Sequence, residues 1–134
     1  MQRDAPVPLL WLHVARADFD IASELNVNEP FALGLRCYHA QQTAEKALKA
    51  LLLHLGIEPP RTHVIVDLLV LLRDAVAVPP QVESARQLTV YATSTRYPDE
   101  LVEATPEDQR TAAEMARATL EWASSIIEAG PPAY

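Results

Sequence analysis

The sequence has few of the residues on which disulfide-bonded, metal-binding and phosphate-cradling proteins depend. Among its 134 residues are one cysteine, Cys37, and three glycines. A single cysteine cannot form an internal disulfide, so we expect a reducing compartment and a small packing residue rather than a nucleophile. Isolated glycines do not make a phosphate-cradling loop, and no pair of histidines has the spacing of a helical zinc site. These absences predict no metal and no cofactor.

Long hydrophobic runs and positive charge are also scarce. No apolar run approaches about twenty residues, the length that spans a membrane, and the first residues lack the pattern of a secretory signal. We therefore expect a cytoplasmic protein with no membrane partner. The net charge of -7 repels phosphate backbones and disfavours binding to RNA. With 49% hydrophobic residues, the chain is long enough for one compact domain over residues 1–134.

Helix-forming segments fill the sequence between its prolines and glycines. Gly56, with two prolines beyond it, predicts the end of the second segment. Thr62 is expected to cap the third segment, and Thr105 followed by Pro106 predicts the start of the last. The expected helices cover about residues 8–25, 31–55, 62–76, 81–95 and 105–128. Because the connections are short, the fold class is predicted to be all-α, an antiparallel up-and-down bundle of about five helices.

The segment 37–54 is expected to lie at the centre of this bundle. Its apolar residues recur at helical spacing, and its alanines let neighbouring helices approach closely. A helix that is apolar nearly all round is covered nearly all round. Gln41, Gln42 and Glu45 should then be partly buried and must find hydrogen bonds. Those bonds form either within the bundle or across a dimer interface.

A row of polar side chains runs along a second face of the same segment. It contains the only two lysines of the chain, Lys46 and Lys49. The row is either a solvated helix face neutralised by Glu45 or a contact for a nucleotide, another anion or an acidic partner. The residues of this candidate site, including two from the turn after the fourth helix, are His39, Gln42, Lys46, Lys49, Arg96 and Tyr97.

Several landmarks occur in an order that matches a known family. The segment 37–54 resembles the core helix of the HEPN domain family. Thr62-His63 before an apolar run is similar to the pair that opens the family's next helix, and Arg96-Tyr97-Pro98 is similar to a later landmark. Trp11-Leu12 followed by Ala17-Asp18-Phe19 resembles the family's first helix. On these residues the chain is identified as a stand-alone HEPN protein of the prokaryotic kind.

The resemblance raises the question of ribonuclease activity. Many HEPN proteins are metal-independent endoribonucleases in which an arginine is followed, after four to six residues, by a histidine that moves protons. This chain has four histidines, none of which lies five to seven positions after an arginine: His13, His39, His54 and His63. The motif is absent, so no catalytic residue is predicted. The alternative is a divergent ribonuclease that uses His39 with Arg36 or Arg96.

The resemblance also implies a role for a chain without that motif. The sequence looks like HEPN proteins that are encoded beside a minimal nucleotidyltransferase and act with it as a two-component, toxin-antitoxin-like pair. We therefore expect a non-catalytic interaction or nucleotide-binding module, an inference that rests on analogy of fold. Family members form two-fold dimers, so a homodimer is expected as well.

Overall fold

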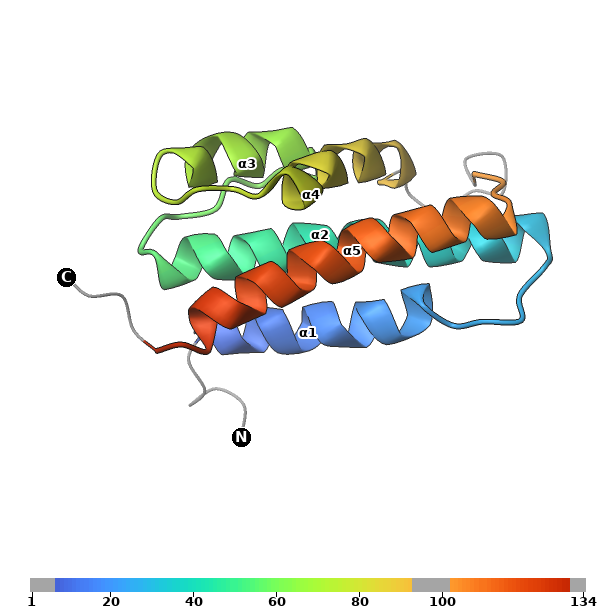
Figure 1. The fold of residues 1–134 in the computed structure, drawn as a ribbon, viewed down its shortest axis with the longest axis horizontal. Helices are drawn as coiled ribbons and strands as arrows, with labels where there is room; N and C mark the ends of the chain where they lie inside the picture. Colours follow the sequence, from blue (N-terminus) through green and yellow to red (C-terminus); the bar gives the residue numbers. More distant parts are fainter. Residues whose placement is uncertain (1–6, 93–101, 131–134) are drawn as a thin grey trace.

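The computed structural model describes residues 7–92 and 102–130 (Figure 1). Within these residues the regular structure is entirely helical, which confirms the predicted all-α antiparallel bundle. None of the described helices is long and apolar enough to cross a membrane. The elements are α1 (Val7–Ala22), α2 (Pro30–His54), α3 (Ile65–Arg73), α4 (Pro80–Glu83), the 3-10 helix η2 (Ser84–Tyr91) and α5 (Pro106–Ile127).

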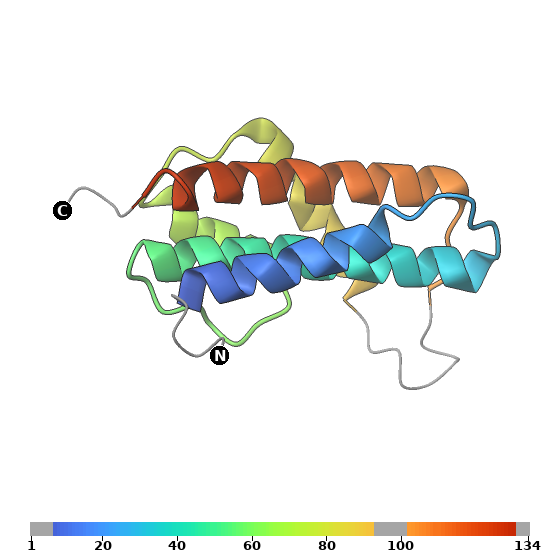
Figure 2. The ribbon, with the colours of Figure 1, turned by 90° about the horizontal axis from the view of Figure 1, so that it is seen from below.

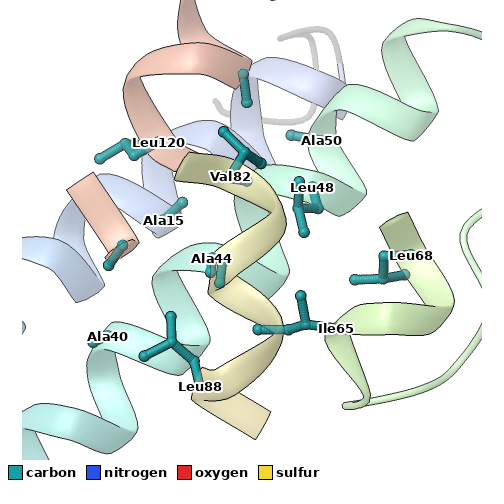
Figure 3. Packing of buried hydrophobic residues seen from close by; sticks show 14 of the residues in the cluster. Ala15, Ala40, Ala44, Leu48, Ala50, Ile65, Leu68, Val82, Leu88 and Leu120 are labelled. Carbon is teal, nitrogen blue, oxygen red and sulfur yellow. The ribbon is translucent and has the colours of Figure 1, made fainter. Parts of the chain in front are cut away.

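Helix α2 lies at the centre of the molecule, as predicted. Helices α1 and α5 pack against it, while α3 and η2 contact it on another side (Figures 1 and 2). Ala40 and Ala44 are buried and, having short side chains, allow these neighbours to come close. Figure 3 shows Ala44 and Leu48 in the same apolar cluster as Val82 and Leu88. The core is therefore built around α2.

The two ends of α2 are fixed by local hydrogen bonds. At the start, the Glu29 carboxylate accepts from the Ala32 amide at 2.7 Å. At the other end, the amides of Gly56 and Ile57 donate to the Leu53 and Leu52 carbonyls at 3.1 and 2.8 Å. This paired arrangement needs a left-handed residue, which Gly56 supplies with a φ of 79°. The predicted stop at Gly56 is confirmed.

Helix α5 begins as the sequence predicted and also closes the end of α1. The Thr105 hydroxyl accepts from the Asp108 amide at 3.0 Å, and the Asp108 carboxylate accepts from the Thr105 amide at 2.9 Å. One turn later, the buried amide of Gln109 donates to the carbonyls of Ala22 and Glu24 at 2.9 and 2.7 Å. These carbonyls lie where α1 ends and would otherwise lack intrahelical partners.

A glycine allows the chain before α5 to cross close to α2. A Cβ built on Gly34 would lie 1.6 Å from the Val102 carbonyl oxygen, closer than any two such atoms can approach. Two residues further on, the Ala104 amide donates to the Pro30 carbonyl at 3.1 Å. Gly34 is therefore required by the close approach of two backbones.

The prediction for the third helix was wrong at both ends. Helix α3 begins at Ile65 and ends at Arg73, whereas residues 62–76 were expected. The Thr62 hydroxyl accepts from the Val64 amide at 3.0 Å and so forms a tight turn before the helix instead of capping it. The first helical amide, that of Ile65, donates to the hydroxyl of Thr89 in η2 at 3.1 Å. A distant residue has replaced the local cap.

The prediction of one α-helix over residues 81–95 was also wrong. Only Pro80–Glu83 is α-helical, and Ser84–Tyr91 forms a 3-10 helix; residues 93–95 lie outside the described part. Val82, Ala85 and Leu88 are fully buried and spaced by three residues. Three residues per turn is the period of a 3-10 helix, which therefore keeps all three on the face that meets the core.

We predict that Leu51→Ala lowers the free energy of unfolding by about 2 to 5 kcal/mol, because it removes a fully buried side chain from the central helix. Urea denaturation measures the change. Val70→Ala is the control, since Val70 on α3 is 50% exposed and should change stability by less than about 0.5 kcal/mol. Equal effects of the two substitutions would contradict the central position of α2.

Candidate functional site

The four α2 residues of the predicted site lie on the side of the helix that faces α1 and the loop before α3. His39, Gln42 and Lys46 are half-buried, and Lys49 is buried. Arg96 and Tyr97 lie outside the described residues. The structure therefore places these four side chains together. His39, Lys46 and Lys49 meet carboxylates, and Gln42 meets the amide of Gln41.

Asp18 of α1 holds two members of the row. Its Oδ2 accepts from Lys46 Nζ at 2.7 Å, and its Oδ1 lies 3.0 Å from His39 Nδ1. Asp18 is only 8% exposed, so its charge is matched within the protein rather than by water. These bonds join the middle of α1 to α2.

Glu45 is the second carboxylate and is more deeply buried than Asp18. Its Oε1 accepts from Gln41 Nε2 at 2.9 Å and lies 3.0 Å from His63 Nδ1, while its Oε2 accepts from Lys49 Nζ at 3.0 Å. Burial raises the pKa of Glu45, but the hydrogen bonds from Gln41, Lys49 and His63 outweigh burial and hold the pKa below its ordinary value of 4.5. Glu45 is therefore ionised at neutral pH.

The glutamines complete the network around Glu45. Gln41 is fully buried, and its amide nitrogen also donates to the His63 carbonyl at 3.2 Å. Its amide oxygen accepts from Gln42 Nε2 at 2.7 Å. Gln41, Gln42 and Glu45 thus find partners within the chain, which was one of the two arrangements left open by the sequence. The network also ties the loop before α3 to the central helix.

Both histidines of the network use the same ring nitrogen. An ionised carboxylate only accepts hydrogen bonds, so Nδ1 of His63 carries the proton toward Glu45, and Nδ1 of His39 carries it toward Asp18. In the neutral form each ring then has Nε2 as an acceptor. The His63 side chain is 72% exposed and that of His39 is 27% exposed. An imidazole oriented in this way can accept a proton or a hydrogen bond at Nε2. Of the two histidines, His39 has the less exposed side chain.

Two hollows border the lysines of the row. One, of about 270 Å³, is lined by Leu10, Trp11, Val14 and Lys46. The other, of about 330 Å³, is also lined by Trp11 and continues past Lys49 to the Pro59–Pro60 turn. Lys49 Nζ lies 5.8 Å from the centre of the Trp11 ring. Trp11 thus separates two shallow sites in which the walls are mostly apolar.

Cys37 behaves as a packing residue. It is fully buried in the core, and burial raises the pKa of its thiol to about 11, with Tyr91 as a hydrogen-bond partner and Asp108 nearby. A thiol with such a pKa is protonated at neutral pH and is a poor nucleophile. The finding agrees with the expectation from the sequence.

Asp18 and Gln109 were given no place in the site from the sequence. Asp18 bonds to Lys46 across 28 residues, and Gln109 bonds to Ala22 across 87. Asp18 does have a weak local signal, because it lies three residues after Ala15 and four before Ala22, on the face of α1 that carries apolar residues.

Comparison with known proteins gives a consistent result. The family model of the HEPN domain matches residues 9–127. The crystal structure of TT1696 from Thermus thermophilus is similar with a TM-score of 0.74 and 30% identity, over 90% of this chain and 98% of that one. The structure of ST0689, an archaeal HEPN homologue, is similar with a TM-score of 0.66 and 28% identity, over 90% and 97%. No curated protein matches the chain.

We predict that Glu45→Gln lowers the free energy of unfolding at pH 7 by about 3 kcal/mol, because it leaves the buried ammonium of Lys49 without a counter-charge. Since the pKa of Glu45 is lowered in the folded state, its stabilising contribution is present above pH 4.5 and is lost as the pH falls through the folded-state value. The difference between wild type and Glu45→Gln should therefore shrink below pH 4.5, as measured by urea denaturation at several pH values.

The control for this prediction is Glu121→Gln. Glu121 also pairs with a cation, Arg117, but its side chain is 65% exposed. Its replacement should change stability by less than about 1 kcal/mol. A Glu45 effect no larger than the Glu121 effect, or one that does not depend on pH, would show that the network does not stabilise the fold.

Proposed function

Because the chain belongs to the HEPN domain family, we propose that it is a non-catalytic module that acts with a minimal nucleotidyltransferase in a two-component, toxin-antitoxin-like pair. The observation that supports this proposal most strongly is the absence of the arginine-histidine ribonuclease motif from its 134 residues. After Arg96, the positions at which the family's histidine would stand hold Leu101, Val102 and Glu103.

The histidines of the polar network have structural partners. His39 bonds to Asp18 of α1, and His63 bonds to Glu45 of α2. The His39 bond joins α2 to α1, and the His63 bond joins the loop before α3 to α2, so both imidazoles contribute to packing. Arg36, the nearest arginine to His39 in the sequence, pairs with Glu24 at 3.2 Å. This arrangement gives both imidazoles and Arg36 structural partners, which supports a non-catalytic module.

Charge also supports a protein partner over RNA. The net charge of -7 repels a polyanion, and both lysines of the chain are paired with carboxylates of the chain. Lys49 is buried and only Lys46 keeps some exposure, so the two lysines form no basic stripe along which a phosphate backbone could bind. A folded nucleotidyltransferase can instead be recognised through surface shape and apolar contacts, for which net charge matters less.

The test has two steps: we expect a gene for a small nucleotidyltransferase beside the gene for this chain, and we co-express the two proteins. We expect the two proteins to elute together in size-exclusion chromatography and to bind with a measurable heat in calorimetry. If no such gene is adjacent, or if the adjacent protein does not bind at high micromolar concentration, the pairing is refuted.

We predict that the purified protein does not cleave RNA above background in a buffer that contains a chelator. The reason is that no histidine follows Arg96 at the family's spacing. Cleavage that is lost in both Arg96→Ala and His39→Ala would instead establish a divergent ribonuclease, in which Asp18 orients the imidazole of His39 as a proton acceptor. His13→Ala is the matched control, because His13 is an exposed histidine on α1.

A nucleotide or other small anion is the second element of the proposal, with its contacts at His39, Gln42 and Lys46. The specific observation is that the Lys46 ammonium donates to Asp18 while its side chain stays 23% exposed, which leaves further donors for a ligand. His39 Nε2 and the Gln42 amide lie along the same row.

We predict that Lys46→Gln weakens the binding of adenosine triphosphate several-fold and reduces its dependence on salt, as measured by calorimetry, because one positive charge is lost. Lys49→Gln should mainly lower stability, since Lys49 is buried against Glu45. Arg86→Gln is the control, because Arg86 is an exposed cation on η2. Binding that is equal in wild type and Lys46→Gln would show that the row is only structural.

A further inference from the structure

A hollow at one end of the bundle takes no part in the proposed function. It is the hollow of about 330 Å³ that lies between the start of α1, the end of α2 and the loop before α3 (Figures 1 and 2). We call it the end hollow. Its volume lies at the lower end of the range for small-molecule sites, about 300 to 1,000 Å³. A ligand that fills it must therefore be small.

The walls of the end hollow are mostly apolar and suit a flat ring. Five apolar residues form them: Val7, Trp11, Leu53, Pro59 and Pro60. Trp11 packs against the core, and the Lys49 ammonium lies 5.8 Å from the centre of its ring, a distance at which a cation attracts the ring. The Trp11 ring is therefore held in place. A second aromatic ring packs well against such a ring in an offset or edge-on arrangement.

Two opposite charges lie at the rim of the end hollow. Glu58 and Arg61 both line it, and both side chains are exposed. They stand three residues apart in the loop, but within residues 7–92 and 102–130 neither of them belongs to an ion pair. Each of these two groups therefore keeps its charge available to a ligand.

The remaining charge in the wall of the end hollow is balanced. Lys49, the third charged residue that lines the hollow, donates to the Glu45 carboxylate at 3.0 Å. His63 of the same loop is bonded to Glu45 as well, and His54 at the end of α2 does not line the hollow. The groups left for a ligand are thus one carboxylate and one guanidinium, which together carry no net charge.

The loop holds Glu58 and Arg61 in a fixed arrangement. The two residues between them are prolines, whose rings restrict the backbone. Around Arg61, the Thr62 amide donates to the Pro60 carbonyl at 2.9 Å and closes a tight turn. The bond from His63 to Glu45 ties the end of the loop to α2. Because the site is formed in advance, little ordering of the loop opposes the binding of a small ligand.

The charges and the apolar walls together define one class of ligand. A nucleotide carries several negative charges but would meet one guanidinium, and a polyamine would meet one carboxylate. A free α-amino acid carries one ammonium and one carboxylate on the same carbon atom and has no net charge. Its two charged groups match the rim, while an aromatic side chain on the same carbon matches the apolar walls.

We propose that the end hollow binds a free α-amino acid with an aromatic side chain. The ring lies against Trp11 and the two prolines of the loop, the Arg61 guanidinium donates to the α-carboxylate, and the Glu58 carboxylate accepts from the α-ammonium. The bound amino acid joins α1, α2 and the loop before α3. This site goes beyond the proposed function, and it depends neither on the nucleotidyltransferase nor on the polar row of α2.

Calorimetry on the full chain with L-phenylalanine and three analogues tests the proposal. 3-Phenylpropanoate lacks the ammonium, 2-phenylethylamine lacks the carboxylate, and L-alanine lacks the ring. We expect L-phenylalanine to bind and each analogue to bind at least about tenfold more weakly, because each loses a charged hydrogen bond or the apolar contact. If L-phenylalanine does not bind at millimolar concentration, or if any analogue binds as tightly, the proposal is overturned.

Variants of the two rim residues test which charge each group of the ligand meets. Arg61→Gln should bind L-phenylalanine about tenfold more weakly and should no longer favour it over 2-phenylethylamine, which has no carboxylate to lose. Glu58→Gln should likewise no longer favour L-phenylalanine over 3-phenylpropanoate. Both residues are exposed, so circular dichroism should show an unchanged helix content.

The matched controls are Arg86→Gln and Glu121→Gln, which each remove an exposed charge far along the chain from the loop. Both should bind L-phenylalanine as wild type does. Binding that is the same in Arg61→Gln and Glu58→Gln as in these controls would show that the rim charges do not recognise the ligand, and it would overturn the proposal. Failure of the chain to bind a nucleotidyltransferase would not affect it.

Discussion

The carboxylate of Glu45 in the middle of α2 is the constraint around which the rest of the polar structure is arranged. A charge buried in the central helix of a bundle is costly unless it is paired and hydrogen-bonded. Lys49 supplies the opposite charge one turn away, Gln41 supplies an amide, and His63 reaches across from the loop before α3. His63 is the third hydrogen-bond partner of Glu45, and this bond fixes the loop before α3 to α2.

The same requirement changes the meaning of the polar row on α2. The sequence left two interpretations of the two lysines open, a solvated helix face neutralised by Glu45 and a contact for an anion or an acidic partner. In the structure, Lys49 balances Glu45 and Lys46 balances Asp18, so the row is nearly neutral and joins α1 to α2. Of the two lysines, Lys46 alone keeps appreciable exposure.

Features that depend on neighbouring residues were predicted well from the sequence. The central helix, its end at Gly56 and the start of α5 at Thr105 all follow from local propensity and capping. Features set by distant partners were not predicted. Asp18 finds its lysine 28 residues away, and the first amide of α3 bonds to Thr89 rather than to Thr62.

The prediction for the fourth helix, residues 81–95, failed for a different reason. Its apolar residues Val82, Ala85 and Leu88 lie in the helix expected over residues 81–95, and steps of three fit both helix types in a short segment. The 3-10 helix differs from the α-helix here because its period of three residues brings all three side chains to the core. Part of the candidate site, Arg96 and Tyr97, follows this segment and lies outside the described residues.

A double-mutant cycle between Glu45 and Lys49 tests the central claim most directly. Unfolding free energies of wild type, Glu45→Gln, Lys49→Met and the double variant give the energy of coupling between the two side chains. If the buried pair organises the network, the coupling is about 1 to 3 kcal/mol at pH 7, and the double variant is more stable than the sum of the two losses predicts. Losses that simply add would contradict this account, because the two charges would then be independent.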